Sequence, residues 1–160
     1  MRVGWTDFPS WKRGRDGYPA ARKGLSRRWN PVLLPGPQAF PWAMDLPDAI
    51  ARFLAKPGAE ETTPFGPDAL VYKVAGKMFA LAVPDDFPAR INLKCDPERA
   101  VLLRDEYPAI IPGYHMSKRH WNTVTLDGSL PAALVRELID HSYDLVVAGL
   151  PKAERVKLVK

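Results

Sequence analysis

The chain has 160 residues, a net charge of +5 and an isoelectric point near 9.4, with 46% hydrophobic and 26% charged residues. These values are typical of one globular domain with a hydrophobic core. The single cysteine, Cys95, excludes an internal disulfide. No apolar run is long enough for a membrane-spanning helix or a secretory signal, so we expect a cytoplasmic protein, and we expect it to be a monomer.

The positive charge is concentrated in residues 1–43, which hold eight basic and two acidic residues. Residues 44–160 hold 15 basic and 16 acidic residues, a net charge of −1. The first segment contains four of the five tryptophans and no lasting period of 2 or 3.6 residues, so we expect a disordered basic extension. We expect Met44 to be the natural start; the alternative is a genuine basic arm that becomes ordered on an acidic partner.

From Met44 onward the first predicted element is a short amphipathic helix over residues 45–54, which begins at a capping aspartate. Two strands follow over residues 70–74 and 77–83, joined by the tight turn Ala75-Gly76. A third strand is predicted over residues 90–94. Asp96 and Pro97 then begin a second helix that continues to about Tyr107, because aspartate caps helices and proline suits their first turn.

Residues 109–112 and 121–126 alternate as strands do, and the turn Asp127-Gly128 follows them. The last helix is predicted over residues 131–149, with a stripe of leucine, isoleucine and valine residues and a glycine at its end. Residues 153–160 are expected to be a frayed basic tail. This order predicts an α+β domain in which the N- and C-terminal helices pack on one face of an antiparallel sheet.

Pairing the hairpin across its turn puts Val74 opposite Lys77, Lys73 opposite Met78, Tyr72 opposite Phe79 and Leu70 opposite Leu81. The last two pairs would form the core face. The other face is then expected to be open, with the outward side chains Lys73, Arg90, Asn92, Lys94, Trp121, Thr123 and Thr125. Basic groups beside an aromatic ring suit phosphate contact and base stacking, although any solvated sheet face is also polar. A bulge near His120 would turn Trp121 into the core.

Residue types that carry catalysis or bind metals do not group along the chain. His115 and His120 lie five apart in a loop without a carboxylate at a ligand spacing, and His141 falls on the apolar stripe of the last helix. Cys95 is expected to be buried, and the pairs Glu60-Glu61 and Asp85-Asp86 to be solvated. We therefore expect no catalytic residues, no metal site, no cofactor and no enzymatic activity.

Several short segments together resemble the MmcQ/YjbR family of small bacterial proteins: EETTPFG (60–66), VYKVAGKMFA (71–80), NLK (92–94), PGYH (112–115), KRHWN (118–122), SY (142–143) and LPK (150–152). The resemblance covers about residues 44–152. It implies a CyaY/frataxin-like two-layer fold and a proposed DNA-binding role through two β-hairpin wings. The wings would be residues 71–80 and 114–125.

The resemblance and the face pattern together give a set of candidate DNA-contacting residues: Lys73, Lys77, Arg90, Lys94, Lys118, Arg119 and Trp121. The leading hypothesis is a non-enzymatic domain that contacts the DNA backbone. The alternative is a protein-interaction or small-ligand module that uses Trp121 and Tyr114 as anchors, with an acidic partner. The near-neutral charge of residues 44–160 requires the basic groups to cluster if DNA is the partner.

Overall fold

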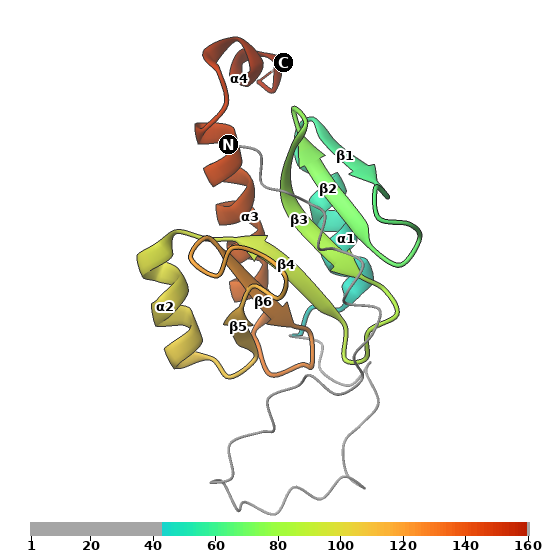
Figure 1. Cartoon of the computed structure of the whole chain (residues 1–160), viewed down its shortest axis with the longest axis vertical. Helices are drawn as coiled ribbons and strands as arrows, with labels where there is room; N and C mark the ends of the chain where they lie inside the picture. Colours follow the sequence, from blue (N-terminus) through green and yellow to red (C-terminus); the bar gives the residue numbers. More distant parts are fainter. Residues whose placement is uncertain (1–42, 160) are drawn as a thin grey trace, which may run out of the picture. The chain divides into compact units, whose positions relative to one another are not determined.

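The computed structural model of the chain describes residues 43–159 (Figure 1). Apart from Ala43, the expected N-terminal extension lies outside the described residues. Met44 is described and belongs to the hydrophobic core, with 5% of its surface exposed.

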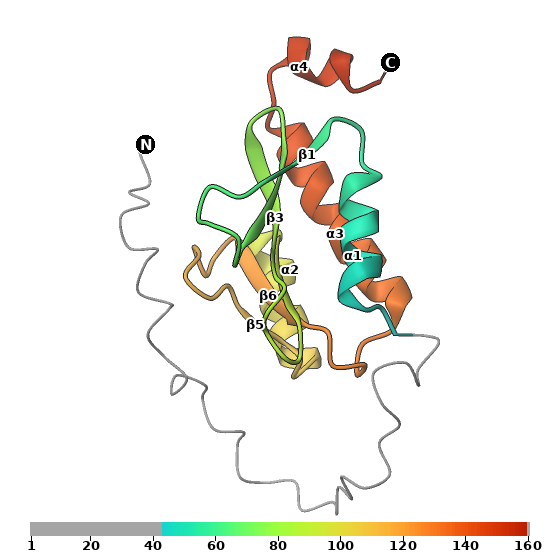
Figure 2. The same ribbon diagram turned by 90° about the vertical axis from the view of Figure 1, so that its right-hand side faces the viewer.

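An antiparallel sheet of six strands forms the centre of the domain, in the order β1-β2-β3-β4-β6-β5. Its strands are β1 (Ala59–Thr62), β2 (Leu70–Val74), β3 (Lys77–Val83), β4 (Arg90–Lys94), β5 (Ile110–Pro112) and β6 (Trp121–Thr125). Helices α1 (Leu46–Leu54) and α3 (Ala132–Ala148) contact each other and cover one face (Figure 2). The predicted α+β fold, with the first helix and the long helix after β6 on one face of the sheet, is therefore confirmed.

The helix starts follow the predicted capping pattern. The Asp45 side chain accepts the backbone N–H of Asp48 at 2.9 Å, and Asp96 caps α2 (Pro97–Glu106) by accepting two backbone N–H groups. Such caps satisfy amide groups that have no partner inside the helix. No helix among residues 43–159 is both long enough and apolar enough to cross a membrane.

The β2–β3 hairpin agrees with the prediction at its turn and departs from it further along. Val74 pairs with Lys77 and Lys73 with Met78 as expected, but Tyr72 pairs with Ala80 because a β-bulge adds one residue to β3. Leu70 accordingly pairs with Ala82, and Leu81 is excluded from the core cluster that contains Phe79 and Ala80. The predicted pairs Tyr72–Phe79 and Leu70–Leu81 were wrong, since strict alternation cannot reveal an inserted residue.

Two elements were not predicted. Strand β1 contains the expected solvated pair Glu60-Glu61, and Glu61 accepts a 2.8 Å hydrogen bond from the buried Tyr72 hydroxyl. The expected frayed tail forms the short helix α4 (Lys152–Lys157) instead. The Leu158 side chain that follows α4 packs partly buried against the core.

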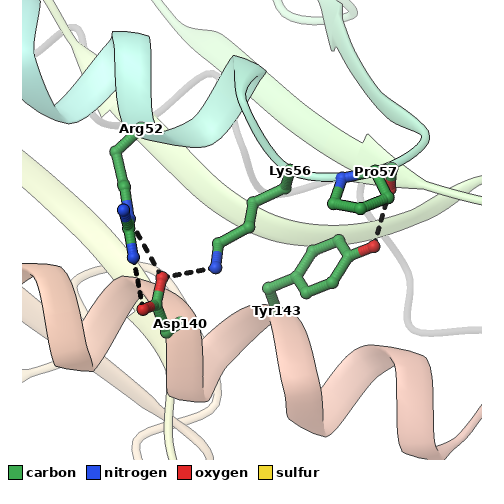
Figure 3. Close-up of polar contacts among 5 residues, drawn as sticks. All are labelled: Arg52, Lys56, Pro57, Asp140 and Tyr143. Carbon is green, nitrogen blue, oxygen red and sulfur yellow. Dashed lines mark hydrogen bonds and ion pairs between the residues drawn. The ribbon is translucent and has the colours of Figure 1, made fainter.

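A polar junction joins α1 to α3 (Figure 3). Arg52 binds the Asp140 carboxylate through two nitrogens, at 3.1 and 2.5 Å, and Lys56 binds the same carboxylate. The Tyr143 hydroxyl donates to the Pro57 carbonyl at 2.6 Å. This junction ties α1 and α3 together where they pack against each other.

Candidate nucleic-acid interface

Two loops leave the sheet at the same end. The strand register forms one row of residues across the sheet through Ala80, Leu93, Asn122 and Pro112. The β2–β3 turn and the β5–β6 loop (residues 113–120) both lie beyond this row in the same direction. The register therefore brings most of the candidate residues to this end: Lys73, Lys77, Lys94, Lys118, Arg119 and Trp121.

The basic residues at this end have no acidic partner in the part of the chain that the structure describes. Among residues 43–159, no ion pair involves Lys73, Lys77, Lys94, Lys118 or Arg119. Some cations elsewhere in the domain are paired with acids: Arg52 and Lys56 bind Asp140, and Arg99 binds Glu137 at 2.5 Å. Lys77, Lys118 and Arg119 are exposed, whereas Lys73 and Lys94 are half-buried.

Arg90 does not belong to this group of cations. It pairs with Val83 and Thr125 at the opposite end of the sheet, about four residues or 13 Å along β4 from Lys94. Its guanidinium binds Asp86 at 2.6–2.7 Å and lies 5.7 Å from the Tyr114 ring centroid. Asp86 is thus an ion-pair partner and not a plain solvated acid, and the charge of Arg90 is largely compensated.

The sheet face opposite α1 and α3 is closed at its centre, contrary to the expectation of an open face. Asn92 is 7% exposed and Thr123 only 1%, and the Thr123 hydroxyl donates to Asn92 Oδ1 at 2.5 Å. The same hydroxyl accepts the Tyr114 backbone N–H at 2.9 Å, which anchors the β5–β6 loop on this face. Figure 2 shows that loop extending from the sheet on the side away from α1 and α3. Alternation assigns a residue to a face but cannot predict whether that face is covered.

Trp121 keeps its predicted orientation. It pairs with Lys94 without a register shift in β6 and is partly exposed. The β-bulge of the sheet occurs between β2 and β3 instead of near His120. An aromatic ring therefore lies beside Lys94 at the loop end of the sheet.

Arg104 on α2 holds the β5–β6 loop in place, which sequence reasoning missed. Its Nε donates to Asn122 Oδ1 at 2.7 Å, and its Nη2 donates to the carbonyls of Trp121, at 3.3 Å, and Lys118. Nothing in the spacing of α2 indicates this role, because the partners are groups of a distant loop and strand. The Nδ2 of Asn122 is buried and finds no hydrogen-bond acceptor among residues 43–159.

Gly113 makes the tight start of this loop possible. A Cβ at this position would lie 2.7 Å from the Cβ of Trp121 and 3.0 Å from its carbonyl oxygen. The Gly113 N–H donates to that carbonyl at 2.8 Å, so the two chain segments must approach closely. The sequence marked Gly113 only as an isolated turn glycine.

The histidines and the cysteine do not form a common site. His115 and His120 are exposed on the loop, and His141 Nε2 accepts the Asp96 backbone N–H at 3.2 Å, as expected for a satisfied boundary histidine. Burial chiefly lowers the pKa of His141 and raises the pKa of Cys95, which is 3% exposed. Within residues 43–159, no group of three or more His, Cys, Asp and Glu side chains has an arrangement that could hold a metal ion.

Comparisons with known proteins agree with the fold. A structure from Deinococcus radiodurans, protein DR2400 of the domain family DUF419, is 44% identical with a TM-score of 0.67, covering 72% of this chain and 88% of that chain. A Pseudomonas syringae protein structure is 32% identical with a TM-score of 0.57, covering 64% and 98%. Both similarities include sequence as well as shape.

Curated relatives match over most of their own length. Uncharacterized protein YbdF of Escherichia coli O157:H7 is 42% identical over 105 residues, 66% of this chain and 86% of that protein. Uncharacterized protein YjbR of Escherichia coli strain K12 is 37% identical over 117 residues, 73% and 99% respectively. The family model described as YjbR matches residues 54–145, more than half of the chain. The chain therefore belongs to the YjbR family.

Proposed function

We propose that this protein is a non-enzymatic domain that binds DNA through its sugar–phosphate backbone. The observation that carries the proposal is a group of cations at one end of the sheet that form no ion pair with residues 43–159: Lys73, Lys77, Lys94, Lys118 and Arg119. A cation already bound to a carboxylate gains little from a phosphate, so unpaired cations are the ones available for it.

The spacing of the two loops suits a duplex. Lys77 is on β3, and residues 118–119 precede β6, two strands away in the sheet. Two strand spacings amount to about 10 Å, which is close to the roughly 12 Å width of the major groove of B-DNA. Contacts from the two loops can therefore reach phosphates on the two sides of one groove. Such contacts position a protein on DNA without reading its sequence.

Fluorescence polarisation with a generic labelled duplex tests this proposal. Lys77→Glu and Lys118→Glu should each weaken binding, and together they should weaken it further. Each variant should also reduce the slope of log K against log salt by about 0.9, because one phosphate fewer is neutralised. Arg136→Glu is the matched control, because it makes the same charge change at an exposed arginine of α3 that forms no ion pair with the described residues. Binding that is insensitive to salt, or equally weakened by Arg136→Glu, contradicts the proposal.

A second candidate function rests on Tyr114, which is 40% exposed. Its ring centroid lies 4.1 Å from the His115 ring centroid, with the two planes tilted by 59°, and 5.7 Å from the Arg90 guanidinium. A partly exposed tyrosine with such contacts is a typical anchor for a protein or small-molecule partner. In this alternative, the Lys118 and Arg119 side chains serve an acidic partner.

The two candidate functions predict different effects of Tyr114 and Lys118 variants on binding. If DNA phosphates are the ligand, Tyr114→Ala should change duplex affinity far less than Lys118→Glu. If a protein or small ligand is the natural partner, duplex binding should be weak, and Lys118→Glu should lower it no more than Arg136→Glu does. Pull-down of an acidic partner should then depend on Tyr114 and Trp121 as strongly as on the basic residues.

A further inference from the structure

Helix α4 lies at the same end of the domain as the β2–β3 turn. Leu158, directly after α4, packs on Gly58. A Cβ built on Gly58 would overlap the Cδ2 of Leu158 and would lie 3.7 Å from the Val74 side chain. Val74 is the last residue of β2 before the turn. Figures 1 and 2 both show α4 beyond the end of the sheet that carries this turn. The C-terminal helix is therefore attached next to the first of the two loops.

The exposed side chains of α4 are mainly basic. Lys157 pairs with Glu154 at 2.8 Å, but Lys152 and Arg155 make no ion pair with any residue of 43–159. Together with Lys73 and Lys77, they make four cations on adjoining elements that form no ion pair within the described part of the chain. Gly58 has φ +68 and no room for a side chain, so the attachment of Leu158 depends on this glycine.

We propose that α4 is a third contact element of the phosphate-binding surface, in which Lys152 and Arg155 bind the DNA that the β2–β3 turn engages. This inference rests on the proposed function. It adds α4 to the DNA-binding surface that the β2–β3 turn and the β5–β6 loop form. An anionic membrane would also attract these cations. However, a membrane-surface helix needs a long apolar face, whereas α4 has six residues and Leu158 is already packed on the domain.

The test reverses each charge of α4 separately and measures duplex affinity by fluorescence polarisation at several salt concentrations. Lys152→Glu and Arg155→Glu should each lower affinity about as much as Lys77→Glu, and each should make the salt slope smaller by about 0.9. Arg136→Glu again serves as the control. It lies on α3 twelve residues, or about 18 Å, before the C-terminal end of that helix, far from α4.

A neutral variant separates the position of α4 from its charge. Leu158→Ser keeps every cation but removes the side chain that holds the helix on Gly58. It should lower duplex affinity by a smaller factor than the charge reversals, because the cations remain but are no longer held beside the β2–β3 turn.

The outcomes distinguish the two proposals. If Lys77→Glu weakens binding but both α4 reversals behave like Arg136→Glu, the role of α4 is refuted and the proposed function stands. If the unmodified chain does not bind duplex at all, both proposals fail. If the α4 reversals abolish binding to phosphatidylserine vesicles and leave duplex binding unchanged, the helix contacts a membrane surface and the inference is overturned.

Discussion

Ser142 illustrates how a single hydroxyl can repair a break in the sheet. The bulge in β3 ends the β3–β4 ladder at Ala80–Leu93, so the Phe79 carbonyl and the Lys94 N–H have no partner in the neighbouring strand. The Ser142 hydroxyl of α3, which is 0% exposed, accepts from Lys94 at 2.8 Å and donates to Phe79 at 2.5 Å. One side chain thus satisfies two buried backbone groups.

Replacing Ser142 should therefore be costly. We expect Ser142→Ala to lower the free energy of unfolding by about 2–4 kcal/mol, because each buried backbone group left unpaired costs roughly 1–3 kcal/mol. Urea denaturation measures the change. Ser117→Ala is the control, because Ser117 is exposed and its hydroxyl forms no hydrogen bond with the described residues. Equal stability of the two variants would show that the bridge is dispensable.

Ala75 occupies a backbone conformation that alanine disfavours. It has φ +48 and Gly76 has φ +75, so both central residues of the hairpin turn have positive φ, as in a type I′ turn. Asparagine tolerates this conformation better than alanine, and we expect Ala75→Asn to stabilise the protein by about 0.5–1 kcal/mol. Thermal unfolding should show a higher Tm. Ala75→Val, which is branched at Cβ, should lower it; the reverse order would contradict this explanation.

At the scale of elements, hydrogen bonds from the Arg104 side chain of α2 hold the β5–β6 loop against the domain. We expect Arg104→Met to remove the three hydrogen bonds that hold the loop and to speed hydrogen exchange of the amides around Lys118 and Trp121. If the loop presents DNA-binding cations, duplex affinity should fall as well. Arg99→Met, on the same helix but bonded to Glu137, is the control and should leave exchange in the loop unchanged.

The elements that the sequence predicted are those with a strong local pattern. Helix α2 was predicted from Asp96 and Pro97, and β4 from strict alternation, and both lie where expected. Strand β1 was missed because Ala-Glu-Glu-Thr has no apolar alternation, and only its pairing with β2 makes it a strand. Helix α4 was missed because its attachment depends on Leu158 meeting Gly58, a hundred residues earlier in the chain.

For the candidate site too, the features set by local sequence were predicted, and the features set by contacts between distant segments were not. The exposure of Lys118 and Arg119 on a loop follows from local sequence, and Trp121 kept its predicted face. The pairing of Arg90 with Asp86 and the burial of Asn92 and Thr123 depend on how loops fold back onto the sheet. A solvated side chain and a side chain under a loop have the same alternation in sequence, so only the fold separates them.

At the scale of the whole molecule, stability in acid should depend on the junction between α1 and α3 (Figure 3). Partial burial alone would raise the pKa of Asp140, but the hydrogen bonds and charges of Arg52 and Lys56 outweigh it and lower that pKa below its usual value. A carboxylate with a lowered pKa in the folded state stabilises the fold above its unfolded pKa of about 3.9, and this contribution disappears as pH falls through the folded pKa.

Asp140→Asn should consequently lower the free energy of unfolding by about 1 kcal/mol at pH 7, because the junction is only partly buried and solvent screens it. The difference in free energy of unfolding between the variant and the unmodified chain should stay constant down to about pH 5. It should shrink below about pH 4, where the carboxylate becomes protonated in the unfolded state. Urea denaturation across this pH range measures it. Asp144→Asn, one turn later on the exposed side of α3, should show neither effect. A difference that persists unchanged to pH 2 would mean that Asp140 stabilises the two helices by packing instead of by its charge.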